Sequence, residues 1–181
     1  LNGRALTVID PIRARTSYKS GRISFAEYRE IQEHACPGKG ACGGAFTANT
    51  MSTSIEVLGL SMPYSSSNPA ASEKKIEECR NAGKQIRYLM ENGIKPSDIL
   101  SKEAFFDAMV IANVFAGSTN AALHLPAMAY AAGIEFTLDD VQRAAEKAPV
   151  LGNFVPSGKY AMQDLHNIGG TPALMKYLLI N

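Results

Sequence analysis

The sequence predicts a predominantly helical segment, which is either a helix bundle or the helical part of a larger α/β domain. Stretches with apolar residues at helical spacing, bounded by capping residues, run through most of the chain. Strand-like text is limited to "ALTVI" (5–9) and "GNFVP" (152–156). With 46% hydrophobic and 19% charged residues among 181, the composition is that of a globular protein with a hydrophobic core.

The first 59 residues contain two predicted helices. Residues 1–21 show no clear periodicity and are expected to be irregular. Ser24 is a typical N-cap, and apolar residues follow it at helical spacing, so we expect a helix over 25–35. A second helix is expected from Thr47 to about Gly59, because apolar residues recur there at i, i+4 and i+7.

The middle of the chain is expected to hold a loop and two more helices. The text "PYSSSNPAAS" (63–72) has the composition of a loop. Ser72 caps a helix that Gly93 ends, and Cys79 lies on its apolar side, where we expect a small buried side chain. The next helix is expected from about Ser101 to Gly117.

The last third of the chain is expected to be helical as well. Residues 118–133 lack a polar face, which predicts a buried helix that Pro126 kinks or delays. Thr137 caps an amphipathic helix over 137–148. The final helix, "TPALMKYLL", has Pro172 in its first turn.

Charge and hydropathy exclude several classes of partner. The formal net charge of +1 gives no electrostatic signal for nucleic acid or for an acidic membrane surface. No apolar run reaches the roughly 18 residues of a membrane span, and the first residues do not resemble a signal peptide. The three cysteines (Cys36, Cys42 and Cys79) form no disulfide framework, which indicates a reducing compartment.

The glycine-rich text "CPGKGACGGAFTANTM" (36–51) has three possible interpretations. A phosphate-binding loop is disfavoured, because the spacing and the Ser/Thr of that motif are missing. A redox pair is disfavoured, because five residues separate Cys36 from Cys42 and a redox pair is usually C-x-x-C. For Cys36 we expect a small apolar side chain.

A metal-ligand interpretation has positive support at Cys42. A cysteine just before a helix N-terminus lies near unpaired N–H groups, which stabilise the thiolate that binds iron or zinc. Gly43 and Gly44 allow backbone amides to approach the sulfur atoms of a cluster. One cysteine cannot hold a cluster, so further cysteines would have to come from outside this chain.

Four blocks of the sequence resemble one enzyme family. These are "CPGKGACGGAFTANTM", "GLSMPYSSSNPA", "AGSTNAALHL" and "VPSGKYAMQDLHNIGGTPALMKYLL", in that order from about residue 21 onward. They are similar to the iron–sulfur dehydratases, a family that includes the dihydroxy-acid, 6-phosphogluconate and sugar-acid dehydratases. The "TANTM" text is similar to the members that act in branched-chain amino-acid synthesis, and "PYSSSNPA" resembles their eukaryotic versions.

The resemblance implies a fold and a cofactor site. The fold implied is an α/β protein with a three-layer α/β/α N-terminal domain, of which residues 1–181 would be a helical part, with the C-terminal domain absent. In that family three cysteines from separate segments hold a 2Fe–2S cluster beside a Mg²⁺ ion. Cys42 corresponds to one of the three, whereas Cys36 does not. The magnesium ligands and catalytic residues of the family are not expected in this chain, which contains no Cys-Asp-Lys text.

Two positions depart from the family pattern. Ala45 stands where members usually carry Met, and Ala116 stands where they usually carry Gly. Because Ala45 is three residues from Cys42, we expect it to line the substrate pocket and to affect substrate preference. The alternative is that it faces helix packing behind the glycine-rich segment, where Met would overpack.

The remaining polar candidates are expected to have structural roles. His124 is expected to be a hydrogen-bonded core residue, and Asp164 is expected to orient His166. A capping cluster is expected in "STN" (118–120), with the alternative that these side chains face the site.

The resemblance implies a hydro-lyase that converts 2,3-dihydroxy-3-methyl carboxylates to 2-keto acids in valine, isoleucine and leucine synthesis. The small-molecule dihydroxy acid would be its substrate, and the whole enzyme would be a homodimer, without a nucleic-acid or membrane partner. The expected compartment is the mitochondrial matrix, with plastid or cytoplasm as alternatives. The alternative functions are a sugar-acid dehydratase of the same family and a non-catalytic scaffold, and the isolated segment is expected to be inactive.

Overall fold

A computed structural model describes residues 1, 6–35, 39–40 and 42–180. Within these residues the regular structure is helical, which confirms the predicted helical character, and the one β-type contact is an isolated parallel bridge between Phe154 and Tyr160. A sheet layer needs several paired strands, so the expected α/β/α layering is not seen in the described ranges. The helices are α1 (Ile9–Lys19), α2 (Phe25–Ala35), α3 (Thr47–Val57), α4 (Glu73–Glu91), α5 (Pro96–Ile99), α6 (Lys102–Val114), α7 (Ala121–Ala131), α8 (Leu138–Lys147), α9 (Met162–Asn167) and α10 (Gly170–Ile180).

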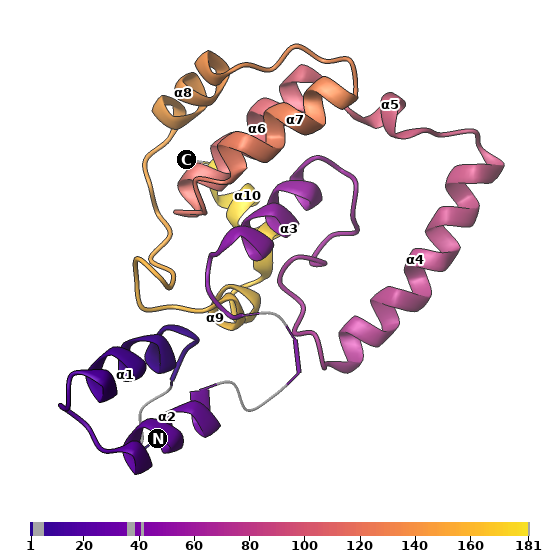
Figure 1. Ribbon diagram of the computed structural model, residues 1–181. Coiled ribbons are helices and arrows are strands. Elements are labelled where there is room, and N and C mark those ends of the chain that lie inside the picture. Colours follow the sequence, from indigo (N-terminus) through magenta and orange to yellow (C-terminus); the bar gives the residue numbers. More distant parts are fainter. Residues whose placement is uncertain (2–5, 36–38, 41, 181) are drawn as a thin grey trace.

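Helix α6 lies at the centre of the main body and contacts α3, α7 and α8 (Figure 1). Its sequence, "KEAFFDAMVIANV", is apolar on nearly all sides, which suits a helix with neighbours on several sides. Phe105 and Phe136 meet here with ring centroids 5.9 Å apart. The core around α6 contains Leu58, Phe105, Ala108, Met109, Ala112, Ala121, Leu125, Ala129, Phe136 and Ala144.

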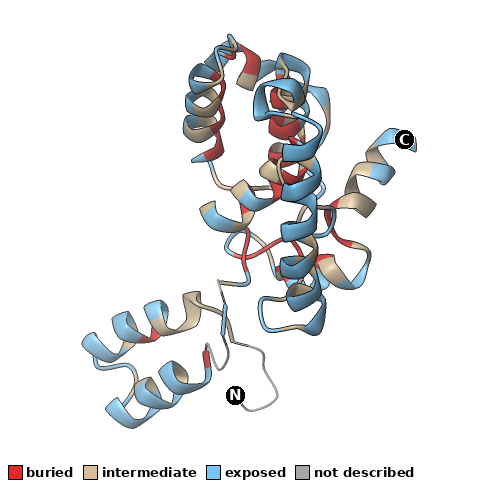
Figure 2. Ribbon diagram, turned by 90° about the vertical axis from the view of Figure 1, so that its right-hand side faces the viewer, coloured by how far each residue is buried: buried red, intermediate tan, exposed pale blue. Residues whose placement is uncertain are grey.

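Helices α1 and α2 pack against each other as a hairpin to one side of the body (Figure 2). The prediction of an irregular N-terminus over 1–21, with strand-like text over 5–9, was wrong because Ile9 begins a helix. The signal for it was Thr7 followed by Asp10: the Asp10 carboxylate accepts the Thr7 N–H at 2.7 Å, as in a capping box. Tyr18 and Tyr28 stack across the hairpin with centroids 5.4 Å apart.

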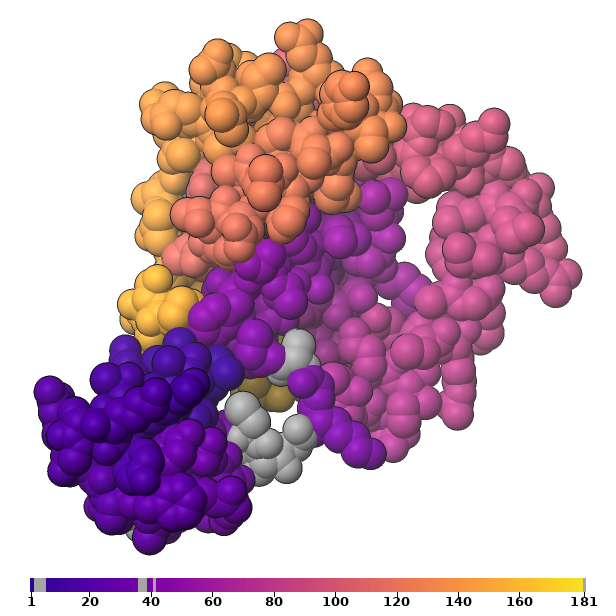
Figure 3. Space-filling model, viewed as in Figure 1, coloured from indigo at the N-terminus to yellow at the C-terminus, as the bar shows by residue number. Residues whose placement is uncertain are grey.

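Helix α4 stands away from the body, and an open gap separates its C-terminal half from the body in the space-filling view (Figure 3). The predicted N-cap is confirmed, since Ser72 Oγ accepts the Lys75 N–H. None of the 19 residues of α4 is buried. The expectation of a buried Cys79 was therefore wrong: its side chain is exposed. Other residues of α4, among them Ala82, Ile86 and Leu89, border a groove of about 490 Å³.

Helix α7 is buried on one side only, so the prediction of a fully buried helix was wrong. Leu125 and Ala129 lie in the core, whereas Tyr130 is 86% exposed. The helix begins at Ala121 and continues through Pro126, so the proline does not delay it. An all-apolar sequence permits burial on every side, but in the described part of the chain the main helical neighbours of α7 are α3, α6 and α8.

The other predicted helices are confirmed. Ser24 and Glu27 form a capping box at α2, and Ser101 Oγ accepts the Ala104 N–H at α6. Thr137 and Asp140 form a capping box at α8, and α10 contains Pro172 as predicted. The short helices α5 and α9 were not predicted. Across the described ranges, no helix is both long and apolar enough to cross a membrane.

Candidate functional site

Cys42 begins a short segment, residues 42–46, that leads directly into α3; we call it the Cys42 segment. The Cys42 side chain is partly exposed and its thiol is free. Thr47 is the first residue of α3, so the cysteine precedes the helix as expected. The other cysteine of the glycine-rich text, Cys36, lies outside the described residues, so the expectation that it is not a ligand stays a prediction.

Asn49, in the first turn of α3, holds the Cys42 segment from one side. Its side-chain Nδ2 donates hydrogen bonds to the carbonyl oxygens of Cys42 and Gly44, each at 2.6 Å. An amide NH₂ group has two donors, so one side chain satisfies both carbonyls. The Cys42 segment is therefore fastened to the helix that follows it. The sequence analysis did not single out this residue.

Residues 153–162 hold the Cys42 segment from the other side. The Ala45 N–H donates to the Val155 carbonyl at 2.6 Å, and the Met162 N–H donates to the Gly43 carbonyl, also at 2.6 Å. The predicted strand "GNFVP" thus forms no strand of its own, but its backbone pairs with the Cys42 segment. The contact is so close at Gly44 that a Cβ atom there would lie 2.6 Å from the Val155 oxygen. Glycine is required at this position because there is no room for a side chain.

The segment 117–120 braces the first turn of α3. Ser118 N–H donates to Thr50 Oγ1 at 2.9 Å, and Asn120 Nδ2 donates to Thr47 Oγ1 at 2.7 Å. Asn120 is the N-cap residue of α7 but makes no side-chain cap hydrogen bond there. The expected capping role for this cluster is therefore wrong for Asn120. The side chains of Ser118 and Asn120 instead contact Thr47 of α3, the helix that follows the Cys42 segment.

Several backbone N–H groups at this helix start lack an acceptor. Within the described residues, no acceptor bonds the N–H groups of Gly44, Thr47 or Ala48, and α3 has no side-chain cap. Unpaired N–H groups at a helix N-terminus favour a negatively charged neighbour. A thiolate, and the sulfur atoms of a cluster bound to it, are neighbours of that kind. Cys42 and its surroundings thus fit the role of one cluster ligand.

The described residues supply only one thiol to such a site. No group of three or more His, Cys, Asp or Glu side chains is arranged to bind a metal ion anywhere in the described ranges. Cys79, the other described cysteine, lies on the separate helix α4. The expectation that further ligands would come from outside the chain stays a prediction.

Ala45 lies in packed protein and not in an open pocket. It is 2% exposed and belongs to an apolar cluster, so the expected role as a pocket residue is not supported and the packing alternative describes its position. The cluster is small, and Met at this position would have to displace aromatic side chains. Its members are Ala45, Phe115, Phe154, Met162 and Leu165.

His166 and Asp164 do not form the expected pair. Asp164 Oδ2 accepts the Ala161 N–H at 2.7 Å and caps α9. Among the described polar atoms, His166 Nδ1 is buried without a hydrogen-bond partner. His124, the other histidine on a helix near the core, is partly buried on α7.

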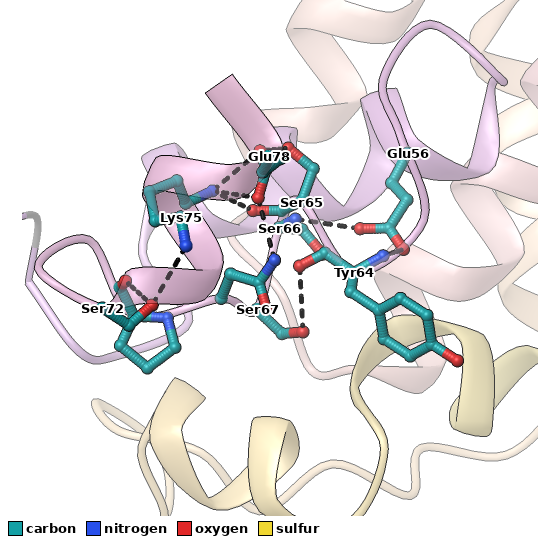
Figure 4. Close-up of polar contacts among 10 residues, drawn as sticks. Glu56, Tyr64, Ser65, Ser66, Ser67, Ser72, Lys75 and Glu78 are labelled. Atoms are coloured by element: carbon teal, nitrogen blue, oxygen red, sulfur yellow. Dashed lines mark hydrogen bonds and ion pairs between the residues drawn. The ribbon is translucent and has the colours of Figure 1, made fainter. Parts of the chain in front are cut away.

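The loop 63–72 is held by a buried carboxylate that the sequence analysis missed (Figure 4). Glu56, on α3, is 8% exposed, and its two carboxylate oxygens accept the N–H groups of Tyr64 at 2.7 Å and Ser66 at 2.9 Å. Tyr64 has φ +70°, a left-handed conformation that is costly for a residue with a side chain. The Glu56 hydrogen bonds stabilise this turn. Ser66 Oγ also lies 2.7 Å from Thr171 Oγ1, which joins the loop to α10.

A second carboxylate fastens the same loop to α4 (Figure 4). Glu78 accepts hydrogen bonds from Ser65 Oγ at 2.7 Å and from Asn68 Nδ2 at 2.9 Å, and Lys75 Nζ lies 2.9 Å from it. Partial burial is the largest single effect on the pKa of Glu78 and raises it, whereas hydrogen bonds from Asn68 and Ser65 lower it. Together with the charge and hydrogen bond of Lys75, they hold the pKa below its ordinary value. Glu78 is therefore ionised at neutral pH and anchors the loop.

An apolar cavity of about 510 Å³ lies beside the Ala45 cluster. It is bounded by the end of α6, the extended residues 151–154, α9 and α10. Phe115 and Phe154, whose ring centroids are 4.6 Å apart, belong both to the cavity lining and to the Ala45 cluster. The two rings separate the cavity from Ala45. The cavity surface is mostly apolar, and its lining includes the polar side chains of Asn153 and Asp164.

Comparison with known proteins gives consistent matches along the chain. It is 51% identical over 179 residues to the dihydroxy-acid dehydratase of Flavobacterium psychrophilum, covering 99% of this chain and 32% of that protein. It is 53% identical over 177 residues to the Lactococcus lactis (strain IL1403) enzyme of the same name, covering 98% and 31%. A mitochondrial dihydroxy-acid dehydratase of Aspergillus terreus is 48% identical over 177 residues, covering 98% and 30%.

The chain thus spans about a third of the length of the curated relatives it matches. These relatives include both bacterial and mitochondrial proteins. A family model matches residues 2–181, nearly the whole chain. The four blocks of sequence and this match agree: the chain belongs to the dihydroxy-acid/6-phosphogluconate dehydratase N-terminal family.

Proposed function

We propose that the chain is part of the N-terminal, cluster-binding domain of a dihydroxy-acid dehydratase. The reaction is the loss of water from a 2,3-dihydroxy-3-methyl carboxylate: the α-proton and the 3-hydroxyl depart, and the enol formed becomes a 2-keto acid. Identity of about 50% to relatives of that name supports this activity over that of a sugar-acid dehydratase. A mitochondrial location is supported by the fungal relatives and by the "PYSSSNPA" text.

The observation that carries the proposal is the position of Cys42. Its segment is fastened on both sides, by Asn49 and by Val155, and lies at a helix start with unpaired N–H groups. Cys42 would hold one iron of a 2Fe–2S cluster, and the N–H groups around it would stabilise the negative charge of the sulfur atoms. When bound, the cluster and a Mg²⁺ ion would supply Lewis acids for the departing hydroxyl and for the substrate carboxylate.

The residues of this chain would hold and orient Cys42 as a cluster ligand. The hydrogen bonds of Asn49, Ala45 and Met162 fix the backbone that carries the cysteine. A preformed ligand segment reduces the entropy lost when the ligand binds. The two other thiols and the magnesium ligands are assigned by this proposal to other parts of the intact enzyme.

The resemblance also predicts a homodimer. Three large apolar side chains on α4, those of Ile76, Ile86 and Met90, are exposed and available for a protein contact. Light scattering of the intact enzyme tests this prediction, and a monomer at micromolar concentration would contradict it.

A serine substitution tests the cluster assignment. In the full-length enzyme, Cys42→Ser should remove most bound iron and acid-labile sulfide and abolish dehydration, because a hydroxyl is a poor replacement for thiolate on iron. Cys79→Ser is the matched control: it makes the same change on exposed α4 and should leave both quantities unchanged.

Two results would overturn the proposal. If Cys42→Ser keeps its iron and sulfide, Cys42 is not a ligand. If the intact enzyme turns over a sugar acid in preference to the branched dihydroxy acid, the substrate class is wrong although the family remains. A protein without bound iron and without turnover of either substrate would be the non-catalytic scaffold.

A further inference from the structure

We propose that Asn49 is the positioning residue for the cluster ligand: it holds the backbone of Cys42 in the geometry that iron binding needs. This inference rests on the proposed function of Cys42. The supporting contact is the pair of hydrogen bonds from Asn49 Nδ2 to the carbonyl oxygens of Cys42 and Gly44, both at 2.6 Å.

The contact is not an ordinary helix cap. An asparagine near a helix start commonly accepts a backbone N–H through its side-chain oxygen. Here both partners are carbonyl oxygens, so the side chain must present its NH₂ group to them. The helix start has no side-chain cap hydrogen bond at all. Asn49 thus donates hydrogen bonds to carbonyl groups of the segment before the helix and does not cap the helix itself.

The Cys42 segment depends on this contact because its own residues constrain it little. Gly43 and Gly44 separate the cysteine from Ala45, and glycine is the residue with the greatest backbone freedom. A single amide that binds the carbonyls of residues 42 and 44 restricts the chain on both sides of Gly43. The backbone bonds to Val155 and Met162 fix residues 43 and 45, so Asn49 supplies the restraint on Cys42 itself.

Asn49 is itself held by a rigid support. The next turn of α3 contains Thr50, Thr53 and Ser54, which are fully buried against the body. Asn120 and Ser118 bind the hydroxyl of Thr47 in the same first turn. The position of Cys42 relative to the core is therefore fixed through α3 and the side chain of Asn49.

The test compares Asn49→Ala and Asn49→Asp in the full-length enzyme with the parent. Both substitutions remove the two donors, and Asn49→Asp keeps the size and shape of the side chain. The control is Asn92→Ala, which removes an equivalent amide-to-carbonyl bond, from Nδ2 to Tyr88 oxygen at 2.8 Å, at the exposed end of α4. Three quantities are measured: melting temperature, the rate of iron release to a chelator, and the EPR spectrum of the reduced cluster.

We expect both Asn49 variants to fold with a melting temperature close to that of the parent. Iron release should be about tenfold faster, the lower end of the effect of removing a residue that orients a metal ligand. The EPR lines of the reduced cluster should shift, because the sulfur of Cys42 changes its orientation. Asn92→Ala should leave all three quantities unchanged.

The inference is overturned if both Asn49 variants release iron at the parental rate with an unchanged EPR spectrum. It is also overturned if both fail to fold, because the role of Asn49 would then be in general stability. Cys42→Ser, measured in parallel, separates this failure from that of the proposed function. Loss of the cluster in Cys42→Ser with parental behaviour of the Asn49 variants rejects the positioning role alone, whereas retention of the cluster in Cys42→Ser rejects the ligand assignment.

Discussion

Ala116 occupies a backbone conformation that favours glycine, and replacing it with glycine should stabilise the protein. It follows the C-cap of α6 with φ +56°, in the left-handed region. The Ala116 N–H bonds the Asn113 carbonyl and the Gly117 N–H bonds the Ala112 carbonyl, each at 2.9 Å, so the turn closes the helix as a Schellman motif does. This is the position at which the family pattern has glycine.

The expected gain follows from two opposing terms. An L-residue with a Cβ in the left-handed region costs about 1–2 kcal/mol. Glycine removes this strain but loses about 0.4–1 kcal/mol through the greater entropy of the unfolded chain. The net stabilisation for Ala116→Gly is then between about 0 and 1.6 kcal/mol, with about 0.8 kcal/mol at the middle of the range. For a domain of roughly this length, this middle value raises the melting temperature by about 1–4 °C.

The assay is urea unfolding and thermal melting of Ala116→Gly beside a matched control. Ala127→Gly makes the same chemical change at an exposed residue inside α7, where glycine should cost about 0.5–1 kcal/mol. The two substitutions are therefore expected to act in opposite directions. A loss of stability in Ala116→Gly equal to that of Ala127→Gly would show that the left-handed turn carries no strain, and would refute the reasoning.

Three further predictions follow from buried side chains. Ala45→Met should lower stability by about 1–3 kcal/mol through overpacking, with bound iron and the Michaelis constant unchanged; a changed Michaelis constant at full stability would restore the pocket role. Glu56→Ala should cost about 2–3 kcal/mol, because the N–H groups of Tyr64 and Ser66 lose a charged acceptor, and faster amide exchange at residues 64–66 would report it; unchanged exchange would contradict it. Asp140→Asn should lower the melting temperature at pH 7, and the difference from the parent should shrink in acid; a difference independent of pH would contradict it.

The sign of the Asp140 effect follows from its surroundings. The N–H of Thr137 holds the pKa of Asp140 below its ordinary value, against the opposing effect of burial. The Thr137 hydroxyl and the nearby positive charges of Lys102 and Arg143 also lower the pKa of Asp140. A carboxyl with a lowered pKa in the folded state stabilises the fold above its unfolded pKa, and this contribution disappears as the pH falls through the folded pKa.

Local chemistry was sufficient to predict most helices. Ser24, Ser72, Ser101 and Thr137 each mark a helix start through a hydrogen bond to a residue three positions later. Such contacts lie within one turn, so the sequence contains both partners at known spacing. The same rule applied to Thr7 and Asp10 would have predicted α1, which was missed because its apolar residues do not form a stripe.

The extent of burial was not predictable from helix periodicity. The apolar face of α4 and the uniformly apolar text of α7 both indicated buried residues, yet Cys79 and Tyr130 are exposed. Periodicity describes which face of a helix is able to pack, whereas burial requires a neighbouring element on that face. That neighbour is determined by the path of the whole chain.

The family and most helix starts could be read from the sequence alone, and the resemblance singled out Cys42 as the expected cluster ligand. How Cys42 is held could not be read from the sequence, because the contacts of its segment join residues far apart in the chain. Val155 and Met162 meet the Cys42 segment across more than 100 positions of sequence, and Ser118 reaches Thr50 across 68. Ala45 lies in a core cluster for the same reason: the aromatic side chains around it are those of Phe115, the C-cap residue of α6, and of Phe154. Spacing along one helix or loop carries no information about such partners, since they are brought together only when the apolar faces of separate elements pack.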